Sequence, residues 1–121
     1  MSTHEDLTKL IAEVRQSIPE LHGVMVASND GLAIAHDFPE AEAERIASMA
    51  ATALVLGSRI AETTNLGSLH EAVIKGDHGY LIVHAAGDSA VLVMSSPADS
   101  NLGLMRIEAR SASAKIGQIL P

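Results

Sequence analysis

The chain has 121 residues, of which 47% are hydrophobic and 19% charged, a balance typical of a folded globular domain and not of a disordered chain. Fifteen acidic residues against eight lysines and arginines leave a formal net charge of -7. That charge would repel nucleic acid and acidic membrane surfaces, so neither is expected as a partner. At this length we expect a single domain, residues 1–121, built around one core.

Two features bear on where the protein is located. The chain has no cysteine, which excludes disulfides and thiolate metal sites and fits a reducing compartment. Residues 1–6 are polar and acidic, without the basic region and apolar run of a signal peptide. The longest weakly polar stretch, residues 46–57, is shorter than the ~20 residues that cross a bilayer. The sequence therefore predicts a cytoplasmic protein that does not insert into a membrane.

The chain begins with a predicted helix and a predicted hairpin. Apolar side chains recur at three- and four-residue steps and indicate a helix that Pro19 ends, with Thr3 and Asp6 spaced as a capping pair at its start. Residues 23–28 and 32–36 are short runs of β-branched and small apolar residues. The Asn-Asp-Gly sequence between them favours a tight turn, so the two runs are expected to pair as a β-hairpin.

A second helix and three strands are expected next. Pro39 precedes an acidic first turn that suits the positive end of a helix dipole, and the helix is expected to end near Thr63. Residues 69–75, 80–86 and 89–96 are strand-like runs joined by short glycine-containing turns. Such turns make neighbouring strands antiparallel, so these runs predict a meander.

The last element predicted is a helix that runs from Leu102 almost to Pro121. Its apolar side chains repeat at alternating three- and four-residue steps, and Asp99 or Ser100 is placed to cap it. The element order is thus α-β-β-α-β-β-β-α. This order predicts an α+β fold in which a five-stranded, mainly antiparallel sheet carries helices on both faces.

The second helix is apolar nearly all round. One stripe is expected to lie against the sheet and consists of Ile46, Met49, Ala50, Ala53, Leu56 and Ile60. A second stripe remains and consists of Ala47, Ala51, Leu54, Val55 and Ser58. Monomers rarely expose wide apolar patches, and a second copy of the same helix about a two-fold axis is the simplest cover. The sequence therefore predicts a homodimer, which Asp at position 51 or 54 is expected to split.

An alternative explanation of this helix requires no partner. Alanine forms helices well, and small apolar residues are common on protein surfaces. On this interpretation the second stripe is simply solvated. The large adjacent side chains of Leu54 and Val55 favour the dimer instead.

No sequence motif for catalysis, a cofactor or a metal is present. The six histidines include no His-x-x-x-His pair or compact cluster. In the predicted meander Lys75 lies opposite Tyr80. That register puts His84 opposite Glu71 and leaves His70 on the other face of the sheet. No P-loop occurs, and no Ser stands beside an evident His and acid. We therefore expect no enzyme activity, no cofactor and no metal.

Three arginines are candidates for contact with a partner. Arg106 and Arg110 are four residues apart on the last helix, so they share a face on which an acidic partner could bind. Arg59 lies near the carboxyl end of the second helix, where a cation favours the helix dipole. The alternative is that all three are ordinary solvated side chains.

Two segments and the element order carry a family resemblance. Residues 23–35, GVMVASNDGLAIA, form the strand, turn and second strand, and residues 101–110, NLGLMRIEAR, start the last helix. With the order α-β-β-α-β-β-β-α, these segments resemble the Roadblock family of dynein light-chain-related proteins over about residues 5–120. The resemblance implies a homodimer or heterodimer in which central helices pack together and third strands pair. Carried over by position, the contact comprises Ala47, Ala51, Leu54, Val55 and Ser58 with His70, Ala72 and Ile74 on the third strand.

The resemblance also implies a function. Members of the family have no catalytic site of their own, and many bacterial members are similar to regulators of Ras-like small GTPases. The compact form of this chain looks like those found with a small GTPase and a sensor kinase in bacterial signalling modules. The first hypothesis is a non-catalytic dimeric regulator or adaptor that binds such a GTPase and modulates its nucleotide cycle. The alternatives are a small-ligand-sensing domain and a purely structural adaptor of a signalling complex.

Overall fold

The computed structural model describes residues 2–121. Within them lie three helices and five strands: α1 (Thr3–Ser17), β1 (Gly23–Ser28), β2 (Ala33–His36), α2 (Glu40–Thr63), β3 (Glu71–Gly76), β4 (Gly79–Ala86), β5 (Ala90–Pro97) and α3 (Leu102–Ile119). The predicted order and element types are confirmed, with strand ends displaced by at most two residues. Within the described residues no helix combines the length and the apolar character needed to cross a bilayer.

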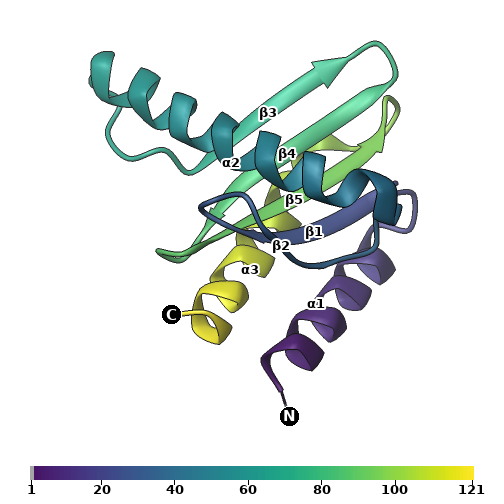
Figure 1. Ribbon diagram of the computed structural model, residues 1–121. Helices are drawn as coiled ribbons and strands as arrows, with labels where there is room; N and C mark the ends of the chain where they lie inside the picture. Colours follow the sequence, from purple (N-terminus) through teal and green to yellow (C-terminus); the bar gives the residue numbers. More distant parts are fainter. Residues whose placement is uncertain (1) are drawn as a thin grey trace.

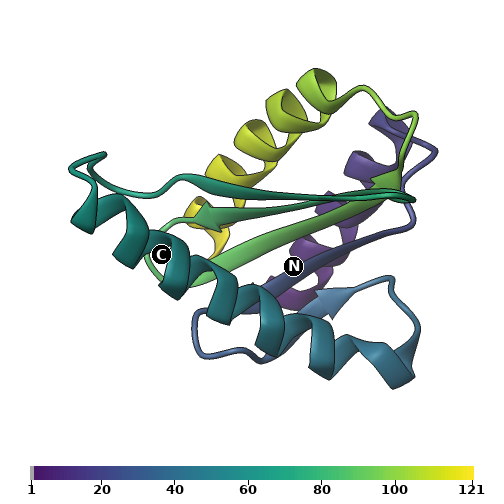
Figure 2. The same ribbon diagram turned by 90° about the horizontal axis from the view of Figure 1, so that it is seen from above.

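The strands form one antiparallel sheet in the order β2-β1-β5-β4-β3, so β2 and β3 are its edges. The helices divide between its faces: α2 crosses one face, and α1 and α3 lie side by side on the other (Figures 1 and 2). The predicted meander of β3, β4 and β5 is present, and its register pairs Lys75 with Tyr80 and Glu71 with His84 as expected. The predicted fold class is therefore confirmed.

Each face of the sheet has its own buried cluster because successive side chains of a strand point to opposite faces. On β4, Ile82 and Ala86 belong to the larger cluster under α1 and α3. Val83, between them, belongs to the smaller cluster under α2, together with Met25 of β1 and Val93 of β5. The smaller cluster receives mainly alanines from α2. The alanine side of α2 is therefore covered by the sheet, and the side with larger apolar residues is left exposed.

The first helix is capped one residue earlier than predicted. The side chain of Ser2 accepts a hydrogen bond from the backbone N–H of Glu5 at 3.1 Å. Thr3 is already the first helical residue, so the predicted pair of Thr3 and Asp6 is not the cap. A capping oxygen stands two or three residues before the amide that it accepts from, and Ser2 has this spacing at the observed start.

The last helix is capped by Asn101, and the prediction of Asp99 or Ser100 is wrong. The Asn101 side-chain oxygen accepts from the backbone N–H of Leu104 at 3.0 Å. The helix begins at Leu102 because the end of β5 is followed by a short turn, in which the Ser100 N–H donates to the Pro97 carbonyl. That turn uses residues 97–100 before the helix can start.

Gly79 is the position in the β3–β4 turn region where a side chain is least tolerated. A Cβ on Gly79 would lie 2.1 Å from the Ser96 carbonyl oxygen, whereas one on its cross-strand partner Gly76 would meet nothing within 4 Å. We expect Gly79→Ala to lower the free energy of unfolding by about 2 kcal/mol, because backbone atoms of β5 must move. Gly76→Ala is the matched control and should change it by less than about 0.5 kcal/mol. Urea denaturation measures both, and equal values for the two variants would contradict the packing.

Candidate dimer and partner interface

The side of α2 that faces the sheet is lined by small residues. Ala43, Ala47, Ala50 and Ala61 are buried, and Ala51 is only 7% exposed. Ala47 and Ala50 belong to the buried cluster under α2, in which Ile46 and Leu54 are partly buried. Strand side chains such as Met25 and Val93 already fill the space above the sheet, so alanines let the helix backbone approach closely.

This arrangement corrects the predicted faces of α2. Ala47 and Ala51 were expected on the outward stripe, but the chain's own sheet covers them. Met49, Leu56 and Ile60 were expected against the sheet, but they are 58%, 58% and 54% exposed. Hydrophobic periodicity shows that two stripes of α2 are apolar, but it does not show which of them is buried. The buried stripe is the one whose side chains fit the space above the sheet, and here these are the smaller ones.

Four apolar residues on the solvent side of α2 form a continuous row. Met49, Ala53, Leu56 and Ile60 follow one another at steps of four, three and four residues, which places them on one line of the helix. We call this row the outer stripe. Three of its four members are large side chains more than half exposed. The surplus apolar surface inferred from the sequence therefore exists, but different residues supply it.

The remaining predicted residues of α2 lie on its other flank. Leu54, Val55 and Ser58 line a hollow of about 500 Å³ together with Arg59 and Asp88 of the β4–β5 turn. Leu54 is half-buried there, whereas Val55 is 57% exposed. The predicted contact set is thus divided: Ala47 and Ala51 are buried, Leu54 is half-buried between the sheet and the hollow, and Val55 and Ser58 are exposed.

The predicted strand residues lie on an open edge. The Ala85 N–H donates to the His70 carbonyl at 2.9 Å, so the backbone groups of His70, Ala72 and Ile74 point toward β4. Those of the alternate residues 71, 73 and 75 point away from β4. Within residues 2–121 no strand pairs with this edge. Ile74 is 52% exposed on the face that carries α2.

The outer stripe and the open edge lie in one region of the molecule. The middle of α2 crosses over the start of β3, and the last turns of α2 extend past that end of the sheet (Figures 1 and 2). The two elements are in contact. An exposed apolar helix face next to the free edge of a strand is the kind of surface that associates with another chain. Burial removes apolar area from water, and pairing gives the free backbone groups of the edge hydrogen-bond partners. This region is the candidate interface.

The three candidate arginines do not converge. Arg59 lies on α2, on the same face of the sheet as the hollow near Asp88. Arg106 and Arg110 lie on α3, on the opposite face, and line a separate pocket. Arg106 is paired there with Glu71 at the start of β3. A single small patch on a partner therefore does not contact all three from one copy of the chain.

A polar line on α2 is the sequence signal that identifies the buried face. Arg45, Thr52 and Arg59 recur every seven residues and are all exposed. Residues seven apart lie on nearly the same line of a helix, so these three mark its solvent side. The opposite line includes Ala47 and Leu54 and is the one that the sheet covers. The outer stripe lies between these two lines.

A family model identifies the class of protein that this fold defines. The model of the Roadblock/LC7 domain matches residues 7–96, so the chain belongs to the Roadblock/LC7 family. It is 37% identical over 97 residues to the uncharacterized protein MJ1340 of Methanocaldococcus jannaschii, an alignment that covers 79% of this chain and 84% of the relative.

Solved structures agree with this assignment. A structure described as MglB with tetrameric arrangement has a TM-score of 0.88 and 18% identity, covering 98% of this chain and 90% of that chain. The gliding protein MglB from Thermus thermophilus has a TM-score of 0.87 and 18% identity, covering 98% and 91% of the two chains. At such identities the likeness establishes the fold.

Proposed function

We propose that this chain forms a homodimer through the outer stripe of α2 and the open edge of β3. The observation that carries the proposal is a row of three large, exposed apolar side chains, Met49, Leu56 and Ile60, on the helix that contacts β3, whose outer edge has no partner strand within residues 2–121. A two-fold axis beside β3 would pair the two edge strands antiparallel and join two five-stranded sheets into one. Ile74 and Ala72, on the face that carries α2, would then lie beneath the two packed helices.

This dimer keeps the arrangement implied by the family resemblance and changes its residues. Ala72 and Ile74 remain in the proposed contact, as does His70 at the beginning of the strand. On α2 the outer stripe takes the place of Ala47 and Ala51, which are already buried within one chain. The description of MglB with a tetrameric arrangement supports association as a property of a structural neighbour.

We further propose that the dimer binds a Ras-like small GTPase and modulates its nucleotide cycle without catalysis of its own. The support is the membership of the Roadblock/LC7 family and the fold shared with MglB. Arg59, exposed at the rim of the hollow on the α2 face, is the candidate side chain for the acidic or phosphate groups of such a partner. A sensor kinase module is a second candidate partner within the same complex, and the proposed location is the cytoplasm.

A binding and turnover experiment tests this function. The chain is used to capture partners in the presence of GDP or of a non-hydrolysable GTP analogue, and GTP hydrolysis by the captured GTPase is then measured with and without the chain. We expect capture to depend on the nucleotide and the hydrolysis rate to change. Binding without a change in rate would leave only the adaptor, and no GTPase captured in either state would contradict the proposal.

Arg59→Ala locates the partner contact within the same assay. We expect it to weaken GTPase binding about tenfold, because it removes a charge-assisted contact at an interface. Lys9→Ala is the matched control, since Lys9 is an exposed cation of α1 on the other face of the sheet. Equal affinities for the two variants would place the GTPase elsewhere on the dimer.

A further inference from the structure

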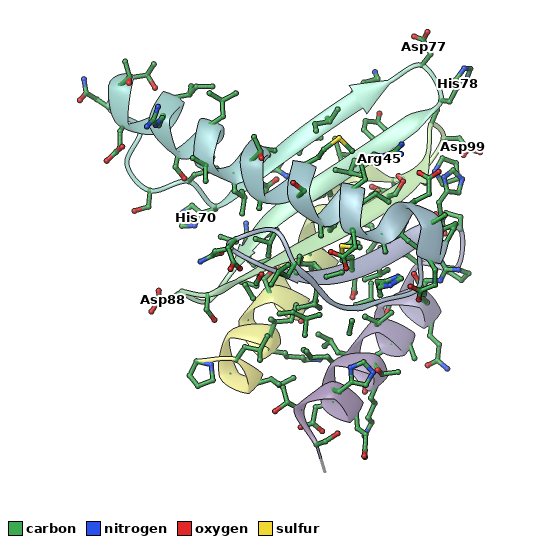
Figure 3. The ribbon with its side chains drawn as sticks, viewed as in Figure 1. Arg45, His70, Asp77, His78, Asp88 and Asp99 are labelled. Carbon is green, nitrogen blue, oxygen red and sulfur yellow. The ribbon has the colours of Figure 1, made fainter. Side chains whose placement is uncertain are left out.

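A pocket of about 550 Å³ lies at the end of the sheet where β3 begins and β4 ends. The last turn of α2 and the loop after it form one wall, and α3 forms the other. His70, which lies on its rim, is at the same end of the sheet as the β4–β5 turn with Asp88 (Figure 3). One chain supplies every wall, so the pocket requires neither the dimer nor a GTPase.

The walls of this pocket carry cations in a chain whose net charge is -7. Arg106 and Arg110 project from successive turns of α3, and Glu71 of β3 is the acidic residue that lines the pocket with them. Arg106 is paired with Glu71. Within residues 2–121 no carboxylate lies within ion-pairing distance of Arg110. Arg110 is therefore a cation without a balancing acid.

A buried histidine adds a third polar group. His84 is 8% exposed and lines the pocket from β4, directly across the strands from Glu71. Its Nδ1 lies 2.7 Å from the Ala85 carbonyl oxygen. A carbonyl oxygen only accepts hydrogen bonds, so Nδ1 carries the hydrogen of this contact. Nε2 then has only a lone pair, so it can accept a hydrogen bond from an N–H or O–H group of a ligand.

The rest of the pocket is apolar. Leu66, in the loop after α2, is 74% exposed, and Leu69 beside it is half-buried. The pocket therefore combines an apolar wall with a few polar groups, which are two arginines and a buried histidine. Small-molecule sites have this composition, and their volumes span about 300 to 1,000 Å³.

We propose that this pocket binds a small organic anion with an apolar body. Its carboxylate or phosphate group is held by Arg106 and Arg110, while its body packs against Leu66 and Leu69. Glu71 competes with the ligand for Arg106. The salt bridge between Glu71 and Arg106 is thus one state of the site, and ligand binding releases Glu71.

Titrations of the full ¹⁵N-labelled chain test the proposal by NMR, with hexanoate, hexyl phosphate and the uncharged hexanol as probes. We expect saturable shifts at residues 66–71, 84, 106 and 110 with dissociation constants in the millimolar range, as befits ligands of so few atoms. If hexanoate binds more strongly, the ligand group is a carboxylate, and if hexyl phosphate binds more strongly, it is a phosphate. Absence of saturation with both anions, or equal binding of hexanol, overturns the proposal.

Two substitutions with opposite expected signs sharpen this test. Arg110→Ala removes an exposed side chain and should weaken anion binding about tenfold, whereas Glu71→Gln removes the competing carboxylate and should strengthen it about threefold. Arg45→Ala is the matched control, because Arg45 is an exposed arginine near the start of α2, at the opposite end of the helix from the pocket (Figure 3). It should not change the affinity for the anion. If Glu71→Gln leaves the affinity unchanged or lowers it, the salt bridge is only structural and the proposal fails.

Discussion

Leu56→Asp is expected to convert the homodimer into a folded monomer. Leu56 lies within the outer stripe and is 58% exposed in one chain, so the new carboxylate faces water in the monomer and leaves the fold intact. In the proposed dimer the same carboxylate would be buried near its two-fold copy, at a cost of several kcal/mol. Sedimentation velocity at micromolar concentration measures the change, and circular dichroism checks the fold.

Ser48→Asp is the matched control for this variant. Ser48 is an exposed residue of the same helix, and its Cα lies beside Gly31 in the β1–β2 turn, away from the outer stripe. It should therefore leave the dimer intact. A wild-type chain that sediments as a stable monomer would refute the proposed interface, and so would a Leu56→Asp variant that remains a dimer.

Ala47→Asp is expected to unfold the chain. Ala47 is 0% exposed and belongs to the cluster that includes Met25 and Val93 beneath α2. An unpaired carboxylate there costs several kcal/mol, a large part of the about 5–15 kcal/mol that stabilise a domain of this size. Urea denaturation followed by circular dichroism, or loss of soluble protein, measures the effect. Thr52→Asp, on the exposed polar line of α2, should keep the fold.

Ala47→Asp also distinguishes the two assignments of the faces of α2. If Ala47 lay on an outward dimer stripe, as the sequence suggests, its substitution would give a folded monomer with near-normal stability. In the structure Ala51 is also covered, so Ala51→Asp is expected to lower stability and not simply to split a dimer. A well-folded Ala47→Asp monomer would therefore show that the observed packing of α2 is wrong.

Most of the fold was predictable because its signals are local. Helical and strand periodicity, the Asn-Asp-Gly turn and the short glycine turns each depend on residues close together in the chain. The register of β3 and β4 followed from their short turn, which is why the pairing of Glu71 with His84 was predicted correctly. The caps of α1 and α3 were missed because several neighbouring polar residues could serve, and only the helix start selects among them.

The candidate sites were less predictable. The sequence indicated surplus apolar surface on α2, and the family resemblance named Ala72 and Ile74 of β3, which lie on an open edge of the sheet. It placed Arg106 and Arg110 on one face of α3, and both line one pocket. The sequence did not predict that His84 and Leu66 lie near these arginines, because the segments that carry them meet only at the end of the sheet.

By itself the sequence determined the element order, the family, and the presence of more apolar helix surface than one short sheet can bury. Only the tertiary structure decided which side of α2 is covered. Both sides are apolar, so their hydrophobic energies are similar, and the choice depends on shape: alanines such as Ala47 fit against the side chains that fill the space above the sheet, whereas Met49, Leu56 and Ile60 do not. The same long-range packing brings β3, β4 and α3 together and forms the arginine-lined pocket.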